Sequence, residues 1–320
     1  MFAALGIYLG APATDTLRAA WHRLTGAPFA AIAIVVAGAL GLVATEAVRI
    51  AAIARLVGAR VGARDAWDAA VANHVMTAVT PQVGLGEPTV AYLLGKRGVA
   101  WDAAVAIPFI KFTSSLALVF LLGAALVIAG FGPPVGPRIA AAAVALFAAI
   151  AALATLVLAL CARPPLARRV IARVRGWLAR WFAGAGSQAR IASAAGVAER
   201  IVDRLANVQR ASRRGVAILC AVHLAYYASY IAPLVGLALV LGDPPLVGLI
   251  ARALVYLCFV FAMPTPGGAG PSEAAAGVFF GDLVAPADAI VVVVVFRAAT
   301  FYLQVLIGVV SIPFTMRRKR

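Results

Sequence analysis

The sequence predicts an all-α integral membrane protein: a polytopic helical bundle with two oppositely oriented re-entrant hairpins of broken helix, related as an inverted repeat. Three observations predict it. Of the 320 residues, 64% are apolar and 12% are charged, and the mean hydropathy is +0.99, which is typical of a membrane bundle. Five apolar runs are long enough to cross a bilayer, which takes roughly 20 residues. Two further apolar regions are interrupted by prolines and glycines, which break helices.

The predicted spans cover residues 28–54, 103–130, 139–162, 215–241 and 287–314. Residues 1–11 are apolar but too short to cross, and they lack the basic start and clear cleavage site of a signal peptide. We expect a truncated or misassigned first span there, or a short partial helix. The chain, 1–320, is predicted to form a single transmembrane domain, with repeat 1 over about 1–130 and repeat 2 over about 139–316.

The first predicted hairpin covers residues 66–96. An apolar helix over 66–80 meets a break whose helix-interrupting residues are Pro81, Gly84 and Gly86. Glu87 then stands at the start of a second, short half-helix, where the positive end of the helix dipole stabilises a carboxylate.

The second predicted hairpin covers residues 246–283. Its break contains Pro264, Pro266, Gly267, Gly268 and Gly270. Pro271 suits the first position of a new helix, which places Glu273 in the first turn. Irregular backbone at membrane depth is tolerated only when it is buried in protein or lines a wet cavity, so both breaks are candidate functional sites.

The distribution of positive charge predicts the orientation. The net charge is +16, and Arg163–Arg214 alone contains twelve arginines. If this segment is cytoplasmic together with Arg49–Arg64, Lys96, Arg97 and the C-terminal Arg317–Arg320, then 22 of the 28 basic residues lie on one side of an inner membrane. Hairpin 66–96 then opens to the cytoplasm and hairpin 246–283 to the outside, an inverted arrangement typical of secondary transporters.

The basic segment 163–214 carries an amphipathic pattern. One helical face would present Leu166, Val170, Val174, Trp177, Leu178 and Trp181. This pattern predicts a cytoplasmic interfacial helix whose arginines reach anionic lipid. The alternative is a solvated connector that merely follows the charge bias. No nucleic-acid-binding motif accompanies the charge, so we expect no nucleic-acid partner.

Ionisable side chains fall within apolar stretches at Glu46, Glu87, Lys111, Arg252, Glu273 and Arg297, and at His74 and His223. Each charge at a helix centre costs roughly 2.5–3.5 kcal/mol on insertion scales, so these groups must be paired, near an interface or facing water. We expect a substrate-binding site formed by Glu87, Lys111, Arg252, Glu273 and Arg297. The alternative is that the glutamates only cap their half-helices or pair with a nearby cation. The two histidines are expected to be hydrogen-bonded within the bundle rather than to act as ligands. Tyr226, Tyr227 and Tyr230 are expected to serve packing, with the alternative that they line a cavity.

Several chemistries lack their motifs. The sequence contains no P-loop, no nucleophile elbow and no paired-histidine metal motif, and Cys161, Cys220 and Cys258 lie in or at the ends of apolar runs. We therefore expect a protein that is not an enzyme, that holds no metal and that needs no cofactor.

Two motifs resemble those of a known family. The stretch Pro264-Thr265-Pro266-Gly267-Gly268-Ala269-Gly270, followed by Glu273, resembles a signature of the lysylphosphatidylglycerol synthase transmembrane family, the flippase-like membrane proteins. A second similarity runs through Asn73, Pro81, Gly86-Glu87, Leu93-Leu94 and Gly98, and Arg297 matches an arginine in that family's last helix. The resemblance covers about Ala30–Ile312. The family's soluble aminoacyl transferase domain has no counterpart within these residues.

The chain also departs from that family. Val90 stands where the family often has arginine, and Lys111, Thr113 and Ser114 stand where it often has an acidic residue paired with arginine and an aspartate. The family's usual contacts on the cytoplasmic side therefore have no direct counterparts at these positions.

The resemblance implies ATP-independent movement of a phospholipid or another polar-headed lipid between leaflets. Facing half-helix N-termini attract phosphate, so anionic headgroups are the expected partners. The alternative is a non-transporting accessory protein that partners a lipid-synthesising enzyme. The lipid's identity, the direction of movement, coupling to a proton or ion gradient and formation of a homo-oligomer stay open.

Overall fold

A computed structural model describes most of the chain. It covers residues 22, 29–80, 85–161, 163–182, 184–210, 213–241, 245–263, 265, 271–284 and 296–316. Every regular element in these ranges is a helix: α3 (Phe29–Leu56), α4 (Ala63–Val79), α5 (Gly86–Lys96), α6 (Trp101–Ile128), α7 (Pro137–Cys161), α8 (Pro164–Trp181), α9 (Ala185–Arg210), α10 (Arg213–Leu241), α11 (Leu246–Ala262), α12 (Pro271–Phe280), η1 (Ala298–Tyr302) and α14 (Leu303–Met316).

Four helices of the described part are long and apolar enough to cross a membrane. They are Ile32–Leu56, Trp101–Ile128, Pro137–Cys161 and Arg214–Ala238. This confirms a multi-pass helical membrane protein and matches four of the five predicted spans. The fifth predicted span, 287–314, is described from residue 296 onward, where it consists of η1 and α14. The predicted partial helix at residues 1–11 lies outside the described residues.

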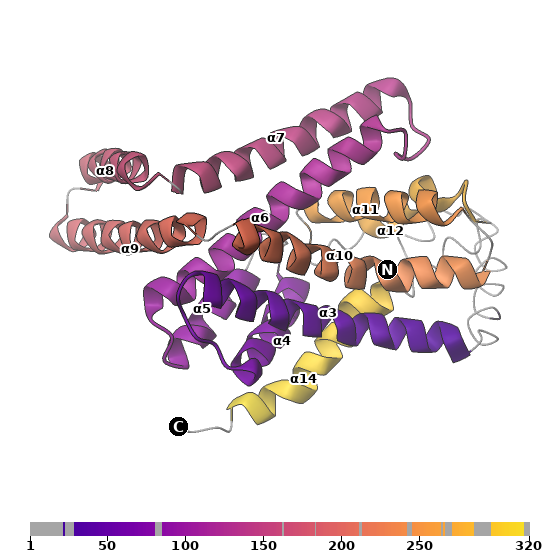
Figure 1. Cartoon of the computed structure of the whole chain (residues 1–320), viewed down its shortest axis with the longest axis horizontal. Helices are drawn as coiled ribbons and strands as arrows, with labels where there is room; N and C mark the ends of the chain where they lie inside the picture. The colour runs from indigo at the N-terminus through magenta and orange to yellow at the C-terminus, as the bar shows by residue number, and fades with distance from the viewer. Residues whose placement is uncertain are drawn as a thin grey trace.

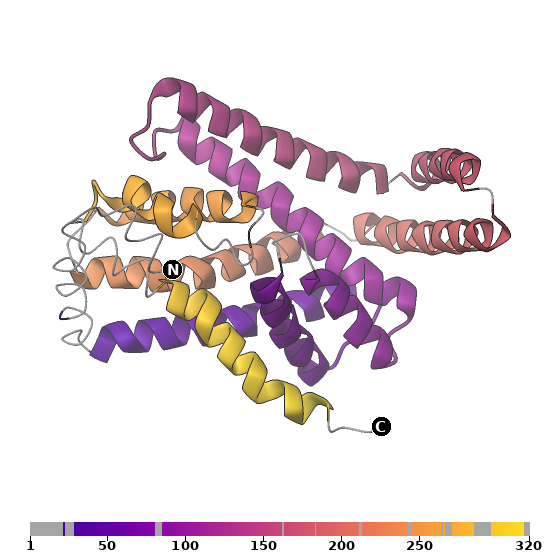
Figure 2. The same ribbon diagram turned by 180° about the vertical axis from the view of Figure 1, so that it is seen from behind.

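The long helices form one oblique bundle. Figure 1 shows α3, α10 and α11 running side by side across the view while α6 crosses them at an angle, and Figure 2 shows the same crossing from behind. α10 packs along α3, and α7 packs along α6. The close approach of α3 and α10 requires Gly38, because a Cβ at this position would lie 2.5 Å from Cγ of Pro233.

The first hairpin folds as the helix pair α4–α5. Arg97, just after α5, donates hydrogen bonds to Asp65 and, at 2.8 Å, to Asp68 in the first part of α4, so the hairpin's two outer ends lie together. At the inner end Gly86 begins α5 against α4, where a Cβ would overlap the hydroxyl of Thr77. Pro81 and Gly84 lie outside the described residues.

The second hairpin folds as the pair α11–α12, and α12 begins at Pro271 as predicted. Arg252 of α11 forms an ion pair of 2.9 Å with Asp282, which follows α12, so this hairpin too is closed by an arginine and an aspartate at its outer ends. The break residues Pro264, Pro266, Gly267, Gly268 and Gly270 lie outside the described residues. Re-entrance of both hairpins and their inverted relation stay predictions.

The basic segment folds as two helices, α8 and α9, that pack against each other. The far end of α9 docks on the bundle through Arg204. Its guanidinium donates to Asp102 at the start of α6 (2.8 Å) and to the carbonyl of Val57 just after α3 (3.2 Å). α9 thereby ties together the ends of two spans.

Among the described residues, two clusters of buried apolar side chains hold the bundle together. The first is aromatic-rich and joins α6, α7, α10 and α11 around Phe120, Tyr227 and Tyr256. The second joins α3, α4, α5 and α6 and consists mainly of Ala, Val, Ile and Leu. Between membrane helices such clusters stabilise the bundle through close packing rather than through removal of apolar surface from water. A charged group buried in such a bundle is costly unless it has partners.

Candidate functional site

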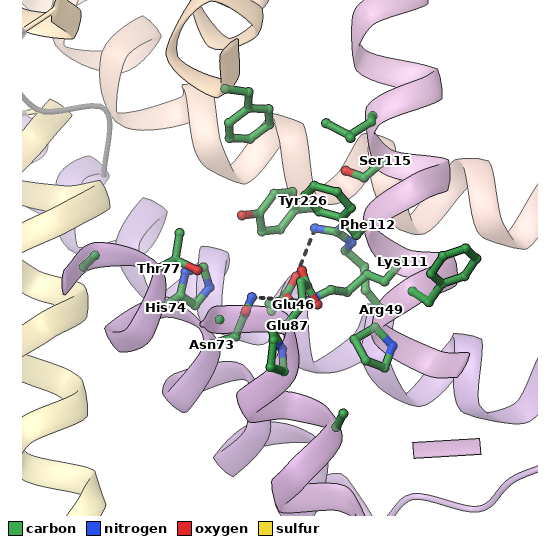
Figure 3. Close-up of a pocket in the computed structure, with 18 of the residues that line it drawn as sticks. Glu46, Arg49, Asn73, His74, Thr77, Glu87, Lys111, Phe112, Ser115 and Tyr226 are labelled. Atoms are coloured by element: carbon green, nitrogen blue, oxygen red, sulfur yellow. Dashed lines mark hydrogen bonds and ion pairs between the residues drawn. The ribbon is translucent and has the colours of Figure 1, made fainter. Parts of the chain in front are cut away.

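A cavity of about 810 Å³ opens among the helices. Its polar lining comes from Glu46, Arg49, Asn73, His74, Thr77, Glu87, Lys111, Ser115, Tyr226, Tyr230 and Thr300. These residues belong to α3, α4, α5, α6, α10 and η1, so early and late parts of the chain converge here. Figure 3 labels residues of the first five of these elements.

Glu46 of α3 is the centre of the polar end of the cavity. It is 1% exposed and accepts hydrogen bonds from Arg49 (2.9 Å), from Asn73 Nδ2 (2.9 Å) and from Lys111 Nζ. Glu46 and Arg49 are three residues apart, which places them on the same helix face. The other two donors come from α4 and α6. Figure 3 shows these side chains pointing toward one another.

Lys111 links two carboxylates. Its ammonium contacts Glu46, and it also lies 3.1 Å from Oε2 of Glu87. The two acids differ in access, since the side chain of Glu46 is 1% exposed and that of Glu87 is 30% exposed. Glu87 lies in the first turn of α5, where the helix dipole favours a negative charge. Glu87 is therefore the member of the cluster that a ligand in the cavity can reach.

Arg49 completes a balanced set of charges. Its guanidinium lies 4.0 Å from the ring centroid of Tyr226 on α10, a cation–π contact. With Glu46, Glu87 and Lys111 it forms a group of two carboxylates and two cations with a formal charge of zero. An unpaired charge at this depth would be costly, so the four groups depend on one another.

The rest of the cavity wall is apolar and largely aromatic. It includes Phe109, Phe112, Phe120, Ile150, Phe261 and Phe301. Two further lining residues, Tyr92 and Trp101, are 53% and 54% exposed, so the cavity reaches the surface of the protein. The cavity thus has a charged end and an apolar wall that is open to the surface, a distribution that suits an amphiphilic ligand.

One wall of the cavity is a π-helix. η1 contributes Thr300 and Phe301 to the lining, and π-helical turns occur frequently at functional sites. Arg297 precedes η1, is 2% exposed and lies with Cζ 4.7 Å from the ring centroid of Phe301. Arg297 does not line the cavity itself, but it contacts a ring that does.

The structure places the predicted site residues in different parts of the molecule. Glu87 and Lys111 line the cavity and contact each other, and Gly86 lines it beside them. Arg297 contacts the lining residue Phe301 without lining the cavity itself. Arg252 lies at the outer end of the second hairpin, where it also donates to the carbonyl of Phe279 at 3.1 Å. Glu273 belongs to α12, but its side chain lies outside what the structure describes.

Several lining residues escaped the sequence-based prediction. The positive-inside rule places Arg49 among the cytoplasmic charges, but the structure buries it to 3% exposure beside Glu46. The sequence did contain a signal for Glu46 and Arg49, namely an acidic and a basic residue three positions apart within an apolar helix. Packing was the expected role of His74, Tyr226 and Tyr230, and all three line the cavity, which for the two tyrosines was the alternative. His223 does bind within the bundle, with Nε2 2.7 Å from the hydroxyl of Ser114.

Within the described ranges, no three His, Cys, Asp or Glu side chains converge in a way that could hold a metal ion.

The similarity of this chain to known proteins extends over most of its length. A family model described as the lysylphosphatidylglycerol synthase TM region matches residues 1–308. A search of curated proteins finds no match.

Proposed function

Because the chain belongs to the lysylphosphatidylglycerol synthase transmembrane family, whose members are membrane proteins tied to lipid metabolism, we propose that it moves a polar-headed lipid between the leaflets of the inner membrane. The movement needs no ATP and no chemical change in the lipid. The C-terminus and the α8–α9 pair face the cytoplasm in this proposal.

The observation that carries the proposal is the amphiphile-shaped cavity. Its volume of about 810 Å³ is within the range of ligand pockets. It suits a headgroup together with the adjoining part of the acyl chains, while the rest of each chain stays in the bilayer. A polar headgroup that crosses along Glu87 and Lys111 avoids the cost of entering bare hydrocarbon.

The charged cluster suggests how an anionic headgroup binds. Glu46 accepts hydrogen bonds from three side chains, and these bonds hold Lys111 and Arg49 in place while the headgroup binds. Glu87 has Lys111 as its ion-pair partner and is the accessible member of the cluster. A lipid phosphate that enters the cavity takes the place of the Glu87 carboxylate at Lys111, and it gains a charge-assisted hydrogen bond there. Glu87 returns to Lys111 when the lipid leaves.

The accessory alternative, a partner of a lipid-synthesising enzyme, gives the cavity no role. A closed bundle would favour that alternative, and a cavity that joins charged and apolar surfaces favours transport. A substitution that fills the cavity and leaves its charged residues unchanged distinguishes the transport function from the accessory function.

We expect Ala262→Trp to slow lipid movement at least about tenfold, because the indole fills space in the cavity and overpacks its wall. Ala262 lines the cavity at the end of α11 and is half-buried. The purified protein is reconstituted in liposomes with fluorescent phospholipids, anionic and zwitterionic in separate samples. Exposure of inner-leaflet label to an impermeant quencher is then followed over time.

The matched control is Ala125→Trp, because Ala125 is an exposed residue of the span α6 that does not line the cavity. Its rate should equal that of the wild type. If the wild type moves no lipid faster than protein-free liposomes, the accessory function takes precedence. Equal rates for Ala262→Trp and the wild type would show that lipid moves elsewhere.

A further inference from the structure

Helix α8 exposes an apolar stripe. Leu166, Val170, Val174, Trp177 and Trp181 follow one another at spacings of three or four residues and are between 38% and 71% exposed. An amphipathic helix of a soluble protein turns such a face toward the core. α8 instead packs on α9 along the side of the helix that adjoins the stripe, where Ala167 is buried and Ile171 and Leu178 are half-buried. The stripe itself stays exposed.

Three exposed arginines border the stripe. Arg169, Arg173 and Arg180 each follow a stripe residue by three positions, so they lie along the same edge. Among the described residues none of the three forms an ion pair with a carboxylate. Arg168, on the opposite side of α8 from the stripe, does form an ion pair, with Asp203 at 2.7 Å. The stripe thus has an apolar centre and an uncompensated positive edge.

The position of α8 relative to the last preceding span fits a membrane surface. The span α7 ends at Cys161, and α8 begins at Pro164. In both Figure 1 and Figure 2, α7 runs across the view while α8 is seen nearly end-on, so the two axes are steeply inclined to each other. An 18-residue helix is about 27 Å long. Because α8 turns away from the direction of α7, its whole length stays near the level at which α7 leaves the membrane.

We infer that α8 lies in the headgroup region of the bilayer and binds anionic lipid. The stripe inserts toward the acyl chains with Trp177 and Trp181 at headgroup depth, and the arginine edge contacts lipid phosphates. This is a second lipid contact, separate from the cavity and independent of the transport proposal. Its ligand is the anionic membrane surface.

The charged edge argues against a second copy of the chain as the occupant. A two-fold dimer through this face would bring the same patch of both copies together. Arg169, Arg173 and Arg180 would then meet their own counterparts, and like charges disfavour that contact. An anionic surface offers the opposite charge over the full length of the edge.

The test places an environment-sensitive fluorophore on α8 of the full chain in liposomes. Val174→Cys carries the label on the stripe, and Ala172→Cys carries it on an exposed position of the opposite side. The half-buried Cys161 and Cys220 are replaced by serine, and the buried Cys258 is kept. Vesicles of phosphatidylcholine alone are compared with vesicles that also contain phosphatidylglycerol. Quenching by spin-labelled lipid and quenching by aqueous iodide are both recorded.

In anionic vesicles we expect blue-shifted emission and lipid quenching at position 174, with iodide quenching confined to position 172. Each arginine near an anionic surface favours binding about fivefold, so replacing Arg169, Arg173 and Arg180 by glutamine should weaken it on the order of a hundredfold. The triple variant then loses the difference between anionic and neutral vesicles.

Three results would overturn the inference. Equal iodide quenching at both positions, without lipid quenching, means that α8 is a solvated connector. Protection of position 174 from both quenchers means that protein covers the stripe. Lipid quenching of equal strength in neutral and anionic vesicles means that the arginine edge does not select lipid charge.

Discussion

Lys111→Met is expected to lower the free energy of unfolding by about 3–5 kcal/mol, the usual cost of removing one partner from a buried ion pair. Lys111 is 1% exposed and lies between Glu46 and Glu87. Without its ammonium, two carboxylates share the single cation of Arg49. The loss should also abolish lipid movement, because the group that receives the phosphate is gone. Thermal unfolding in detergent measures the first effect, with a midpoint lowered by roughly 10 °C.

Lys96→Met is the matched control, since Lys96 is an exposed lysine at the end of α5, 5.6 Å above the ring of Tyr92. A surface change of this kind usually alters stability by no more than about 0.5 kcal/mol. An unchanged midpoint for Lys111→Met would mean that the lysine does not hold the cluster together.

Glu46→Gln is the second change with a large expected effect. It removes the carboxylate that accepts from Arg49, Asn73 and Lys111, and it leaves Arg49 and Lys111 close together with Glu87 alone to balance them. We expect a loss of about 3 kcal/mol or more, because an uncompensated buried charge remains. The midpoint of thermal unfolding is again the measurement. Asp203→Asn, in an exposed ion pair with Arg168, should cost at most about 1 kcal/mol.

The double variant Lys111→Met with Glu46→Gln separates charge balance from packing. It retains Arg49 and Glu87, so the formal charge of the cluster returns to zero. Its destabilisation should be smaller than the sum of the two single effects by about 0.5–3 kcal/mol, the usual coupling between contacting residues. Strict additivity would contradict the view that the four groups act as one network.

The sequence was sufficient to predict most of the helices. Long apolar runs have one structural solution in a bilayer, so the boundaries of α3, α6, α7 and α10 follow from hydropathy within about two or three residues. Proline and glycine also act locally, and they predicted the start of α12 at Pro271 and the position of Glu87 in the first turn of α5.

The partners within the site could not be predicted in the same way. Lys111 and Glu46 are 65 positions apart, and only the crossing of α3 and α6 brings them together. The sequence marks both as charges that need partners, but it does not say which partners. Arg49 was assigned to the wrong environment because basic residues near the end of a span usually reach the interface. Tyr226 looked like a packing residue because its role depends on the cation above its ring.

The central claim is that the cavity holds a lipid headgroup, and site-specific photo-crosslinking tests it most directly. Benzoylphenylalanine replaces Phe112, which lines the cavity, or Leu121, which is 62% exposed on the same helix α6. After irradiation of intact membranes, mass spectrometry identifies the attached lipids. The account predicts adducts at position 112 that are enriched in one class of phosphate-bearing headgroup, and adducts at position 121 that reflect the bulk membrane. Lipid adducts at position 121 but none at position 112, or the same lipid composition at both, would contradict it.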